Sequence, residues 1–460
     1  MDFTDLVHRQ RAFFQTGATR PLDFRREQLR KLSAALERHE SPLLAALQAD
    51  LRKSSFQGYS SELGLLQAEI RHALKHLARW GAPVRSRTPW FLAPSRSWVQ
   101  PEPFGVALIL GPWNYPVQLL LAPLVGAIAA GNCAVLKPSE LAPRTAQASA
   151  ALVQETFAEN FVSIFNGGVD AAEALLRERF DKIFFTGSTR VGRAVMAAAA
   201  KQLTPVTLEL GGKCPAIVCD DAALGQAAKR IAWGKFMNAG QTCIAPDFVL
   251  VQRGVREAFV NALKKSLREF YGADARTSPD YGRIVNARHF ARLVNYLRDG
   301  KIIHGGEQEA KDLFLAPTIL TEVLPESPVL QEEIFGPILP VLDFDDLDDA
   351  LARLRDRPSP LALYVFTGNP ATAARVLAET RSGGACVNDV ISHMIGPGLP
   401  FGGLGESGMG SYHGRAGFDA FSHQRAVLRR ATWLDTPFRY PPERLSLSSL
   451  KRAMRFLLGN

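Results

Sequence analysis

Cys243 stands in a segment that is poor in residues typical of helices and strands. The segment reads Asn-Ala-Gly-Gln-Thr-Cys-Ile-Ala-Pro over residues 238–246. A free cysteine is usually a small buried hydrophobic residue, but this one follows a Gly-Gln-Thr turn. Because a thiolate is a strong nucleophile and a good acyl carrier, Cys243 is a candidate for covalent catalysis.

Two further side chains could assist such a nucleophile. Glu209 follows the apolar run Val-Thr-Leu and precedes two glycines in Glu-Leu-Gly-Gly-Lys. A carboxylate there can act as a general base if burial raises its pKa toward neutrality. Asn114, in Gly-Pro-Trp-Asn-Tyr-Pro, carries an amide N–H that could stabilise an oxyanion. Each residue, taken alone, also fits an ordinary turn.

Two turns carry residues suited to a nucleotide. Gly187 and Gly192 follow the expected strand 181–186, where glycines let a phosphate approach and a helix start supplies N–H donors. Lys137 and Glu140, in Lys-Pro-Ser-Glu, could hold ribose hydroxyls. Neither turn matches the GxGxxG fingerprint, and each also fits a routine loop. A glutamate at 140 would repel a 2′-phosphate, which favours NAD over NADP.

Glu333 and Phe335 lie in Glu-Glu-Ile-Phe-Gly-Pro and pair an acid with an aromatic ring two residues later. The pair could hold a sugar and a flat ring. More often, such a pair is an exposed charge beside a buried phenylalanine.

The elements that must position these residues alternate along most of the chain. The first 80 residues have apolar positions at three- and four-residue spacing, which is typical of helices. Later, short apolar strands alternate with helices, which predicts two tandem parallel sheets covered on both faces. Ligands bind at the carboxyl ends of such strands. The expected strands are 105–111, 133–138, 162–168, 181–187 and 206–209, and then 214–221, 247–252, 314–320, 336–344, 362–367 and 384–389.

The composition indicates a folded protein of two or three subdomains. The 460 residues are 47% hydrophobic and 22% charged, which leaves little room for disorder. Five cysteines without a CxxC pair favour a reducing compartment, here the cytoplasm, over a disulfide framework. No metal site is expected, because no His cluster has zinc spacing. The N-terminal residues lack a signal-peptide core, so secretion is not expected.

The charge distribution argues against a nucleic-acid partner. From Arg425 to the end there are eight Lys/Arg and two Asp/Glu, so six of the nine net positive charges lie in the tail. A basic tail differs from a basic groove. The uncharged stretch 103–136 is interrupted by prolines, and its longest helix would span about 21 Å, less than the ~30 Å of a bilayer core. We expect a buried strand–helix–strand unit there.

In combination, the motifs resemble the aldehyde dehydrogenase superfamily from about residue 10 to about residue 425. Seven motifs occur in the family's order: Gly-Pro-Trp-Asn, Lys-Pro-Ser-Glu, Phe-Thr-Gly-Ser, Glu-Leu-Gly-Gly-Lys, Gly-Gln-Thr-Cys, Glu-Glu-Ile-Phe-Gly-Pro and Pro-Phe-Gly-Gly-Leu-Gly-Glu-Ser-Gly. The short N-terminus, Cys-Ile-Ala-Pro-Asp-Phe and the segment 410–423 resemble the class-three branch, which includes fatty and aromatic aldehyde dehydrogenases.

The resemblance implies a role for each candidate. Cys243 would be the nucleophile, Glu209 the general base, and Asn114 part of the oxyanion hole with the Cys243 N–H. The residues that would contact the cofactor are Trp113, Lys137, Glu140, Gly187, Ser188, Gly192, Glu333 and Phe335. The residues of the expected substrate pocket are Tyr115, Phe401 and His413.

The resemblance also implies a domain organisation and an assembly. We expect an α/β fold with a Rossmann-variant cofactor domain, a catalytic domain and a small bridging sheet through which a homodimer forms. The expected boundaries are 1–84 and 104–210 for the NAD-binding domain, 211–423 for the catalytic domain, 85–103 and 424–435 for the bridging element, and 436–460 for a basic amphipathic tail.

The implied reaction is NAD(P)-dependent oxidation of a hydrophobic aldehyde, medium- or long-chain aliphatic or aromatic, through a thiohemiacetal and a thioester on Cys243. Glu209 would activate the water that releases the acid. One alternative is a relative that passes the acyl group to coenzyme A, which would not need Glu209. A structural protein that has lost activity and a Cys-His hydrolase are further alternatives.

The C-terminal residues can form an amphipathic helix. Its apolar side would contain Leu447, Leu450, Met454, Leu457 and Leu458, opposite Arg452 and Arg455. Such a face either packs on its own protein or a partner subunit, or lies on an anionic membrane surface.

Overall fold

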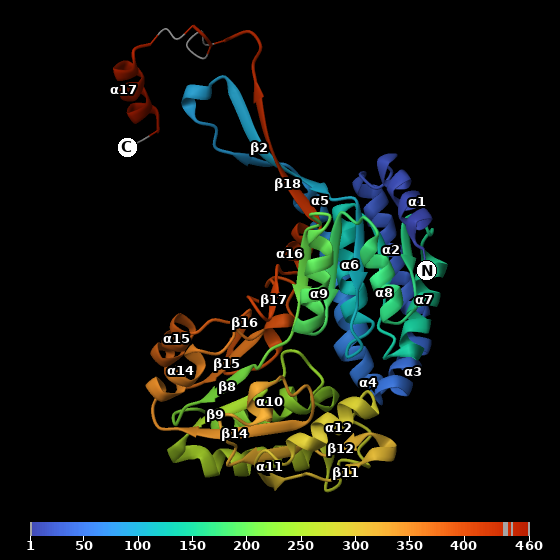
Figure 1. Cartoon of the computed structure of the whole chain (residues 1–460), viewed down its shortest axis with the longest axis vertical. Helices are drawn as coiled ribbons and strands as arrows, with labels where there is room; N and C mark the ends of the chain where they lie inside the picture. Colours follow the sequence, from blue (N-terminus) through green and yellow to red (C-terminus); the bar gives the residue numbers. More distant parts are fainter. Residues whose placement is uncertain (1, 436–439, 443–444, 459–460) are drawn as a thin grey trace.

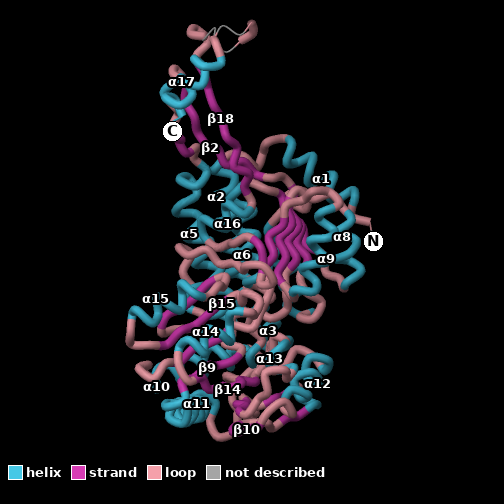
Figure 2. The backbone as a smooth tube through the Cα atoms, turned by 60° about the vertical axis from the view of Figure 1, so that its left-hand side comes forward, coloured by secondary structure: helices cyan, strands magenta, loops and turns pink. Residues whose placement is uncertain are grey.

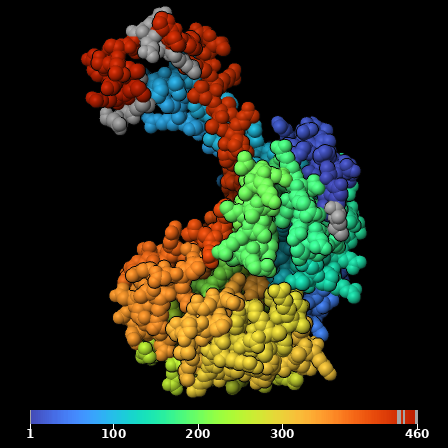
Figure 3. Space-filling model, viewed as in Figure 1, coloured from blue at the N-terminus to red at the C-terminus, as the bar shows by residue number. Residues whose placement is uncertain are grey.

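The computed structural model describes residues 2–435, 440–442 and 445–458. Two α/β units, each built on one main sheet and called here the first and the second layer, are stacked on each other. A thin arm projects from the first layer, which is the upper one in Figure 1. The arm carries the C-terminal helix α17 far from the body, which the space-filling view also shows (Figure 3).

The first sheet has six strands in the order β17-β7-β6-β3-β4-β5, and all pairs are parallel except β17 with β7. Most of its residues are fully buried, as expected for a sheet covered on both faces. Figure 2 shows it between α2, α5, α6 and α16 on one side and α1, α8 and α9 on the other. The strands are β3 (Val106–Leu110), β4 (Cys133–Lys137), β5 (Val162–Ile164), β6 (Lys182–Thr186), β7 (Val206–Glu209) and β17 (Gly408–Met409).

The helices around this sheet come mainly from the first 200 residues. They confirm the helical pattern predicted for the N-terminal part. The helices are α1 (Thr4–Gln15), α2 (Leu22–Arg38), α3 (Glu40–Leu51), α4 (Ser55–Gly58), the π-helix η1 (Tyr59–Leu63), α5 (Gly64–Gly81), α6 (Gln118–Ala130), α7 (Pro143–Thr156), α8 (Val169–Arg177), α9 (Thr189–Ala200) and α16 (Gly414–Ala420).

The second sheet has seven strands in the order β10-β13-β14-β9-β8-β15-β16, parallel except for the edge pair β10–β13. Its strands are β8 (Pro215–Val218), β9 (Phe248–Gln252), β10 (Lys301–His304), β13 (Thr318–Thr321), β14 (Ile338–Phe344), β15 (Ala362–Phe366) and β16 (Gly384–Val387). A two-stranded ribbon, β11 (Gln308–Glu309) and β12 (Phe314–Leu315), lies beside it. Its helices are α10 (Leu224–Phe236), η3 (Met237–Gly240), α11 (Arg256–Tyr271), α12 (Ala287–Tyr296), α13 (Pro328–Gln331), α14 (Leu347–Arg355) and α15 (Pro370–Glu379).

The arm is a three-stranded antiparallel sheet in the order β1-β2-β18. It consists of β1 (Val84–Ser86), β2 (Ser95–Pro103) and β18 (Ser422–Arg430), and α17 (Leu447–Leu458) lies near its tip. The small sheet expected from the sequence is thus present, while the ranges 85–103 and 424–435 and the bridging role remain predictions. In β18 the edge away from β2 is open within the described residues.

The uncharged stretch 103–136 forms β3, α6 and β4, as predicted, and α6 is buried on all sides. Among the described residues, no helix combines the length and the apolar character needed to cross a bilayer. The proposed domain boundaries remain a prediction. The elements β17 and α16 come from the end of the proposed catalytic range, but β17 pairs with the first sheet and α16 lies beside α6.

Candidate active site

Cys243 lies on the loop that joins η3 to β9, where three consecutive residues adopt left-handed backbone angles. These are Asn238 (φ +53°), Ala239 (φ +50°) and Gly240 (φ +74°). Left-handed geometry is costly for residues with a Cβ, so the turn is held by its surroundings. A Cβ at Gly240 would lie 2.2 Å from the carbonyl oxygen of Gly336. The glycine therefore lets the cysteine loop pack directly on the 333–337 turn.

The backbone around Cys243 is fixed by bonds to its carbonyl oxygens. The Asn114 amide donates to the Gln241 carbonyl (3.0 Å), the Cys214 thiol to the Cys243 carbonyl (3.4 Å), and the Tyr364 hydroxyl to the Ile244 carbonyl (2.5 Å). Asn114 belongs to the first α/β layer, and Cys214 and Tyr364 belong to the second. The nucleophile is thus held from both sides of the interface between the layers.

The Cys243 residue is half-buried, and its surroundings disfavour the thiolate anion. Burial, and then the nearby carboxyl groups of Glu333 and Glu209, raise the pKa of this thiol to about 12. The thiol is therefore neutral at pH 7. It must give up its proton to a base before or during attack.

Glu209 ends β7 and is 2% exposed. Both of its carboxyl oxygens are buried, and neither has a hydrogen-bond partner among the described residues. Burial raises the pKa of this carboxyl well above its usual value. An unpaired buried carboxyl is destabilising, and its pKa lies in the direction that a general base at neutral pH requires.

Asn114 follows β3 and is 3% exposed. Its amide nitrogen has two N–H groups, of which one is donated to Gln241. No described residue accepts the other. The backbone carbonyl of Asn114 accepts bonds from Lys53 (2.8 Å) and Asn238 (2.9 Å), which fixes the residue in place.

Glu333 and Phe335 lie on the turn beneath the cysteine loop. Burial, and then the charge of Asp247, raise the pKa of the Glu333 carboxyl to about 8. A Cβ at Gly211 would lie 2.1 Å from a Glu333 carboxyl oxygen. The Glu333 side chain can therefore approach the Glu-Leu-Gly-Gly turn only because residue 211 is a glycine. The Phe335 ring meets the Trp113 ring edge to face at 5.3 Å.

The other candidate cofactor residues follow β4 and β6. Lys137 ends β4 and donates to the Glu140 carboxylate at 2.8 Å, with the lysine buried and the glutamate half-exposed. Ser188 caps α9 through a bond from the Val191 N–H. Gly192 packs on Leu210, where a Cβ would come within 2.7 Å.

These residues fit a dinucleotide. The Thr186 hydroxyl, at the carboxyl end of β6, is buried without a described partner, and the N-terminus of α9 next to it has free N–H groups that attract phosphate. A Cβ at Gly187 would collide with the Phe185 ring at 2.5 Å. Because β4 is third from β7 in the sheet order, Lys137 and Glu140 lie far from Glu209, as an extended cofactor requires.

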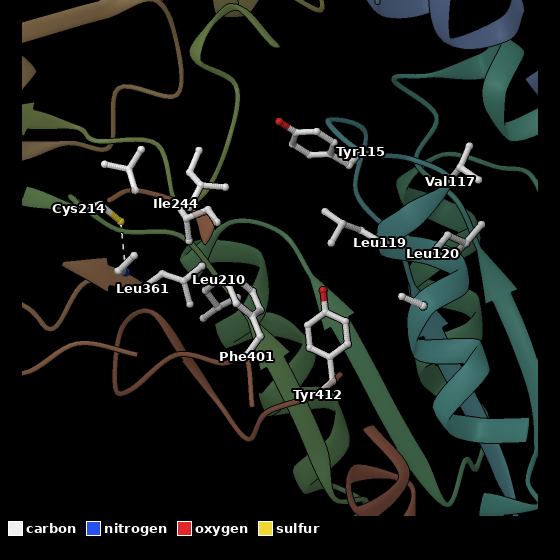
Figure 4. Packing of buried hydrophobic residues seen from close by; sticks show 14 of the residues in the cluster. Tyr115, Val117, Leu119, Leu120, Leu210, Cys214, Ile244, Leu361, Phe401 and Tyr412 are labelled. Carbon is white, nitrogen blue, oxygen red and sulfur yellow. Dashed lines mark hydrogen bonds between the residues drawn. The ribbon is translucent and has the colours of Figure 1, made fainter. Parts of the chain in front are cut away.

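The expected substrate-pocket residues are all buried: Tyr115 (8% exposed), Phe401 (5%) and His413 (6%). Figure 4 shows Tyr115 and Leu119 on one side of a space and Ile244, Leu210 and Phe401 on the other. The Tyr115 hydroxyl contacts the Thr242 hydroxyl at 2.7 Å. His413 lies 3.5 Å from the Glu69 carboxylate.

The structure thus brings Cys243, Glu209 and Glu333 together, since the two carboxyl groups influence the thiol directly. Several neighbouring residues could not be recognised as part of the site from the sequence. Tyr412 is buried, and its hydroxyl, which interacts with the Gln118 side chain, points toward the space between Leu210 and Leu119 in Figure 4. The other missed neighbours are Lys53, Glu62, Cys214 and Tyr364. Tyr412 adjoins the predicted His413, but the rest had no local motif.

Comparison with known proteins gives a consistent picture. A sequence model of the aldehyde dehydrogenase family matches residues 1–427. Aldehyde dehydrogenase family 3 member A2 of Mus musculus is 48% identical over 98% of this chain and 93% of its own. The dimeric, NADP-preferring aldehyde dehydrogenase of the same species is 46% identical over 96% of this chain and 98% of its own. The substrate-bound AldH structure from Staphylococcus aureus superimposes with a TM-score of 0.95 and 43% sequence identity. The match covers 98% of this chain and 99% of that one.

Proposed function

This chain belongs to the aldehyde dehydrogenase family, and we propose that it oxidises a hydrophobic aldehyde to its carboxylic acid through a thioester on Cys243. The observation that carries this mechanism is Glu209, a buried carboxyl near the Cys243 thiol that has no hydrogen-bond partner among the described residues. A site with these two groups suits attack by sulfur followed by hydrolysis.

In the first half of the reaction, the Cys243 sulfur bonds to the aldehyde carbon and its proton passes to a base. The carbonyl oxygen becomes an oxyanion that the free N–H of Asn114 and the backbone N–H of Cys243 stabilise. Removing one such donor typically costs about 3 kcal/mol of transition-state stabilisation. When the oxyanion collapses, the C–H bond breaks and a thioester remains on Cys243.

In the second half, Glu209 takes a proton from water, and the hydroxide displaces the sulfur from the acyl carbon. The carboxylic acid leaves and the thiol is restored. A relative that transfers the acyl group to coenzyme A would not need this carboxyl, so Glu209 favours hydrolysis.

The family is NAD(P)-dependent, and the bound cofactor supplies the acceptor for the aldehyde's hydride. We assign the nicotinamide ribose and ring to Glu333, Phe335 and Trp113, and the pyrophosphate to the turn Gly187, Ser188 and Gly192. Lys137 and Glu140 would hold the adenine ribose. The exposed Glu140 carboxylate repels a 2′-phosphate, so we propose NAD, although one relative is named as NADP-preferring.

The proposed substrate class rests on the buried apolar cluster against which Cys243 packs, since the following five residues belong to it. Tyr115, Leu119, Leu210, Ile244 and Phe401 are each less than 9% exposed. Apolar side chains of this kind favour a medium- or long-chain aliphatic or an aromatic aldehyde over a polar one.

We further propose a homodimer in the cytoplasm, with the domain boundaries expected from the sequence and with the arm as the bridging element. The support is the open edge of β18 and a relative whose name describes it as dimeric. In α17, Leu447, Leu450 and Met454 are exposed. We propose that the partner subunit covers this face, with a membrane surface as the alternative. The side chains of Leu457 and Leu458 and the tail residues 436–439, 443–444 and 459–460 lie outside the described part.

The activity is tested with a panel of aldehydes, NAD or NADP, and NADH or NADPH formation as the readout. The proposal expects steady turnover, the highest kcat/KM for apolar aldehydes with NAD, and no change when coenzyme A is added. Turnover that required coenzyme A, or a preference for small polar aldehydes, would reject it.

A further inference from the structure

A buried ion pair lies outside the residues assigned to catalysis. The Lys53 ammonium donates to the Glu62 carboxylate at 2.6 Å, and the side chains are 1% and 0% exposed. Lys53 follows α3, and Glu62 lies in the π-helix η1. Removing two charges from water is expensive, and a buried pair is often no more stable than apolar residues of the same size. The further contacts of this pair therefore indicate its role.

Lys53 contacts the segment that carries the oxyanion amide. Its ammonium donates to the backbone carbonyl of Asn114 at 2.8 Å and lies 3.9 Å from the centre of the Tyr115 ring. The Tyr115 hydroxyl in turn contacts the hydroxyl of Thr242 at 2.7 Å, the residue before Cys243. One cation therefore touches Asn114 directly and reaches the nucleophile's neighbour through one ring.

Glu62 holds the other end of the same segment. Its second carboxyl oxygen accepts bonds from the N–H groups of Val117 (2.8 Å) and Gln118 (3.2 Å). These are the first N–H groups of α6, whose cap residue Val117 supplies no side-chain cap. A carboxylate at a helix N-terminus is stabilised by the helix dipole, so Glu62 acts as the missing cap from a distant part of the chain.

Both ends of residues 114–118 are thus tied to one buried pair, which comes from the N-terminal helices. A shift of this segment would move the Asn114 amide relative to the Cys243 sulfur, and catalysis is sensitive to shifts of about 1 Å. We propose that Lys53 and Glu62 are positioning residues that fix Asn114 at the oxyanion. This deepens the proposed function and rests on it.

If Lys53 acts through Asn114, the loss of Lys53 should matter only while Asn114 is present. A double-mutant cycle of the two residues tests this. Lys53→Met keeps the length of the side chain and removes its charge. In the wild-type background it should lower kcat by about 10- to 100-fold, with KM and NAD affinity changed less than about threefold. In an Asn114→Ala background the same substitution should lower kcat by less than about threefold, because residues that act as one unit are not additive.

Lys182→Met is the matched control. Lys182 is also a buried lysine beside an aromatic ring, Phe104 (5.9 Å), but it lies in β6 and shares no contact with residues 114–118. Its kcat should stay within about twofold of the wild type. Thermal unfolding of every variant shows whether a loss of activity reflects loss of the fold.

If Lys53→Met does not fold, Lys53→Met/Glu62→Gln removes both charges and leaves an amide oxygen that can still accept the Val117 and Gln118 bonds. It should fold and show the same dependence on Asn114. Equal losses with and without Asn114, or an unchanged kcat in Lys53→Met, would overturn the positioning role. Wild-type kcat in Asn114→Ala would instead refute the oxyanion step of the proposed function.

Discussion

Two carboxyl groups and the thiol that they surround all have their neutral form favoured by burial. Burial raises the pKa of the Glu209 carboxyl, sets the pKa of Glu333 at about 8, and sets that of the Cys243 thiol at about 12. Such a site avoids the cost of unpaired charge in the resting state. Each group gains its charge only when the reaction or the pH demands it.

The shift of Glu333 makes stability depend on pH. Its pKa is about 8 in the folded protein against an ordinary value of 4.5, so between these values the folded state binds more protons than the unfolded state. Stability therefore falls as pH rises from about 4.5 to about 8. Glu333→Gln should remove this component, so that its free energy of unfolding, relative to the wild type, improves progressively over that range.

Urea unfolding at several pH values measures the effect. Glu326→Gln serves as control, since Glu326 is exposed, and its curve should follow the wild type throughout. Parallel wild-type and Glu333→Gln curves would show that the Glu333 pKa is not raised.

At this scale, the sequence was informative where chemistry and local motif coincide. Cys243, Glu209 and Asn114 stand in recognisable turns and could be predicted. Lys53 could not, because its bond to Asn114 spans 61 residues and a lysine after a helix usually faces solvent. That Glu209 has no hydrogen-bond partner in the described part of the chain also depends on surroundings that no short segment reveals.

The loops that present these groups depend on close backbone contact. The turn 238–240 is left-handed, and Gly240 meets the Gly336 carbonyl. These contacts join η3 and the loop before β14, so the cysteine loop and the Glu333 turn form one unit.

Gly240→Ala should destabilise the protein by at least about 2 kcal/mol and reduce activity, because the new methyl meets backbone and the angle is unfavourable. Gly225→Ala is the control. Gly225 lies in α10 with nothing within 4 Å of an added Cβ, so alanine should be neutral or stabilising by up to about 1 kcal/mol. Thermal and urea unfolding compare the two. A fully stable and active Gly240→Ala would contradict the tight packing.

The buried strands of the two main sheets were predictable as elements, since each is a short apolar run between turns. The expected strand 314–320 was wrong in one respect, because it is divided at Ala316 and Pro317 into β12 and β13, which belong to different sheets. The strands β10, β11 and β17 were not predictable, because they have only two to four residues and partly exposed or glycine-containing sequences. Their pairing is set by neighbours distant in sequence, which local patterns do not contain.

The whole molecule has an arm that suits contact with another copy. The arm leaves the body in Figure 3, and Leu428 in β18 and Trp433 after it are 50% and 77% exposed. An open antiparallel edge with apolar side chains is a pairing surface. The sheet itself could be predicted from the family resemblance, but its distance from the body could not.

A dimer predicts a sedimenting mass twice the 50.3 kDa of one chain. Leu428→Glu should shift it toward the monomer by placing a charge at the paired edge, whereas Val169→Glu, at an exposed position of α8 on the body, should not. A chain ending at residue 440 should sediment as a weaker dimer if α17 packs on the partner. Tail-dependent flotation with anionic liposomes would indicate the membrane instead, and a monomeric wild type would reject the assembly.

The most direct test of the account is mass spectrometry of enzyme quenched during turnover with an aldehyde and NAD. The account predicts an acyl mass on the peptide that contains Cys243, more abundant in Glu209→Gln because water is no longer activated, and both adduct and activity lost in Cys243→Ser. An unimpaired Cys243→Ser enzyme, or turnover without any acyl adduct in Glu209→Gln, would contradict it.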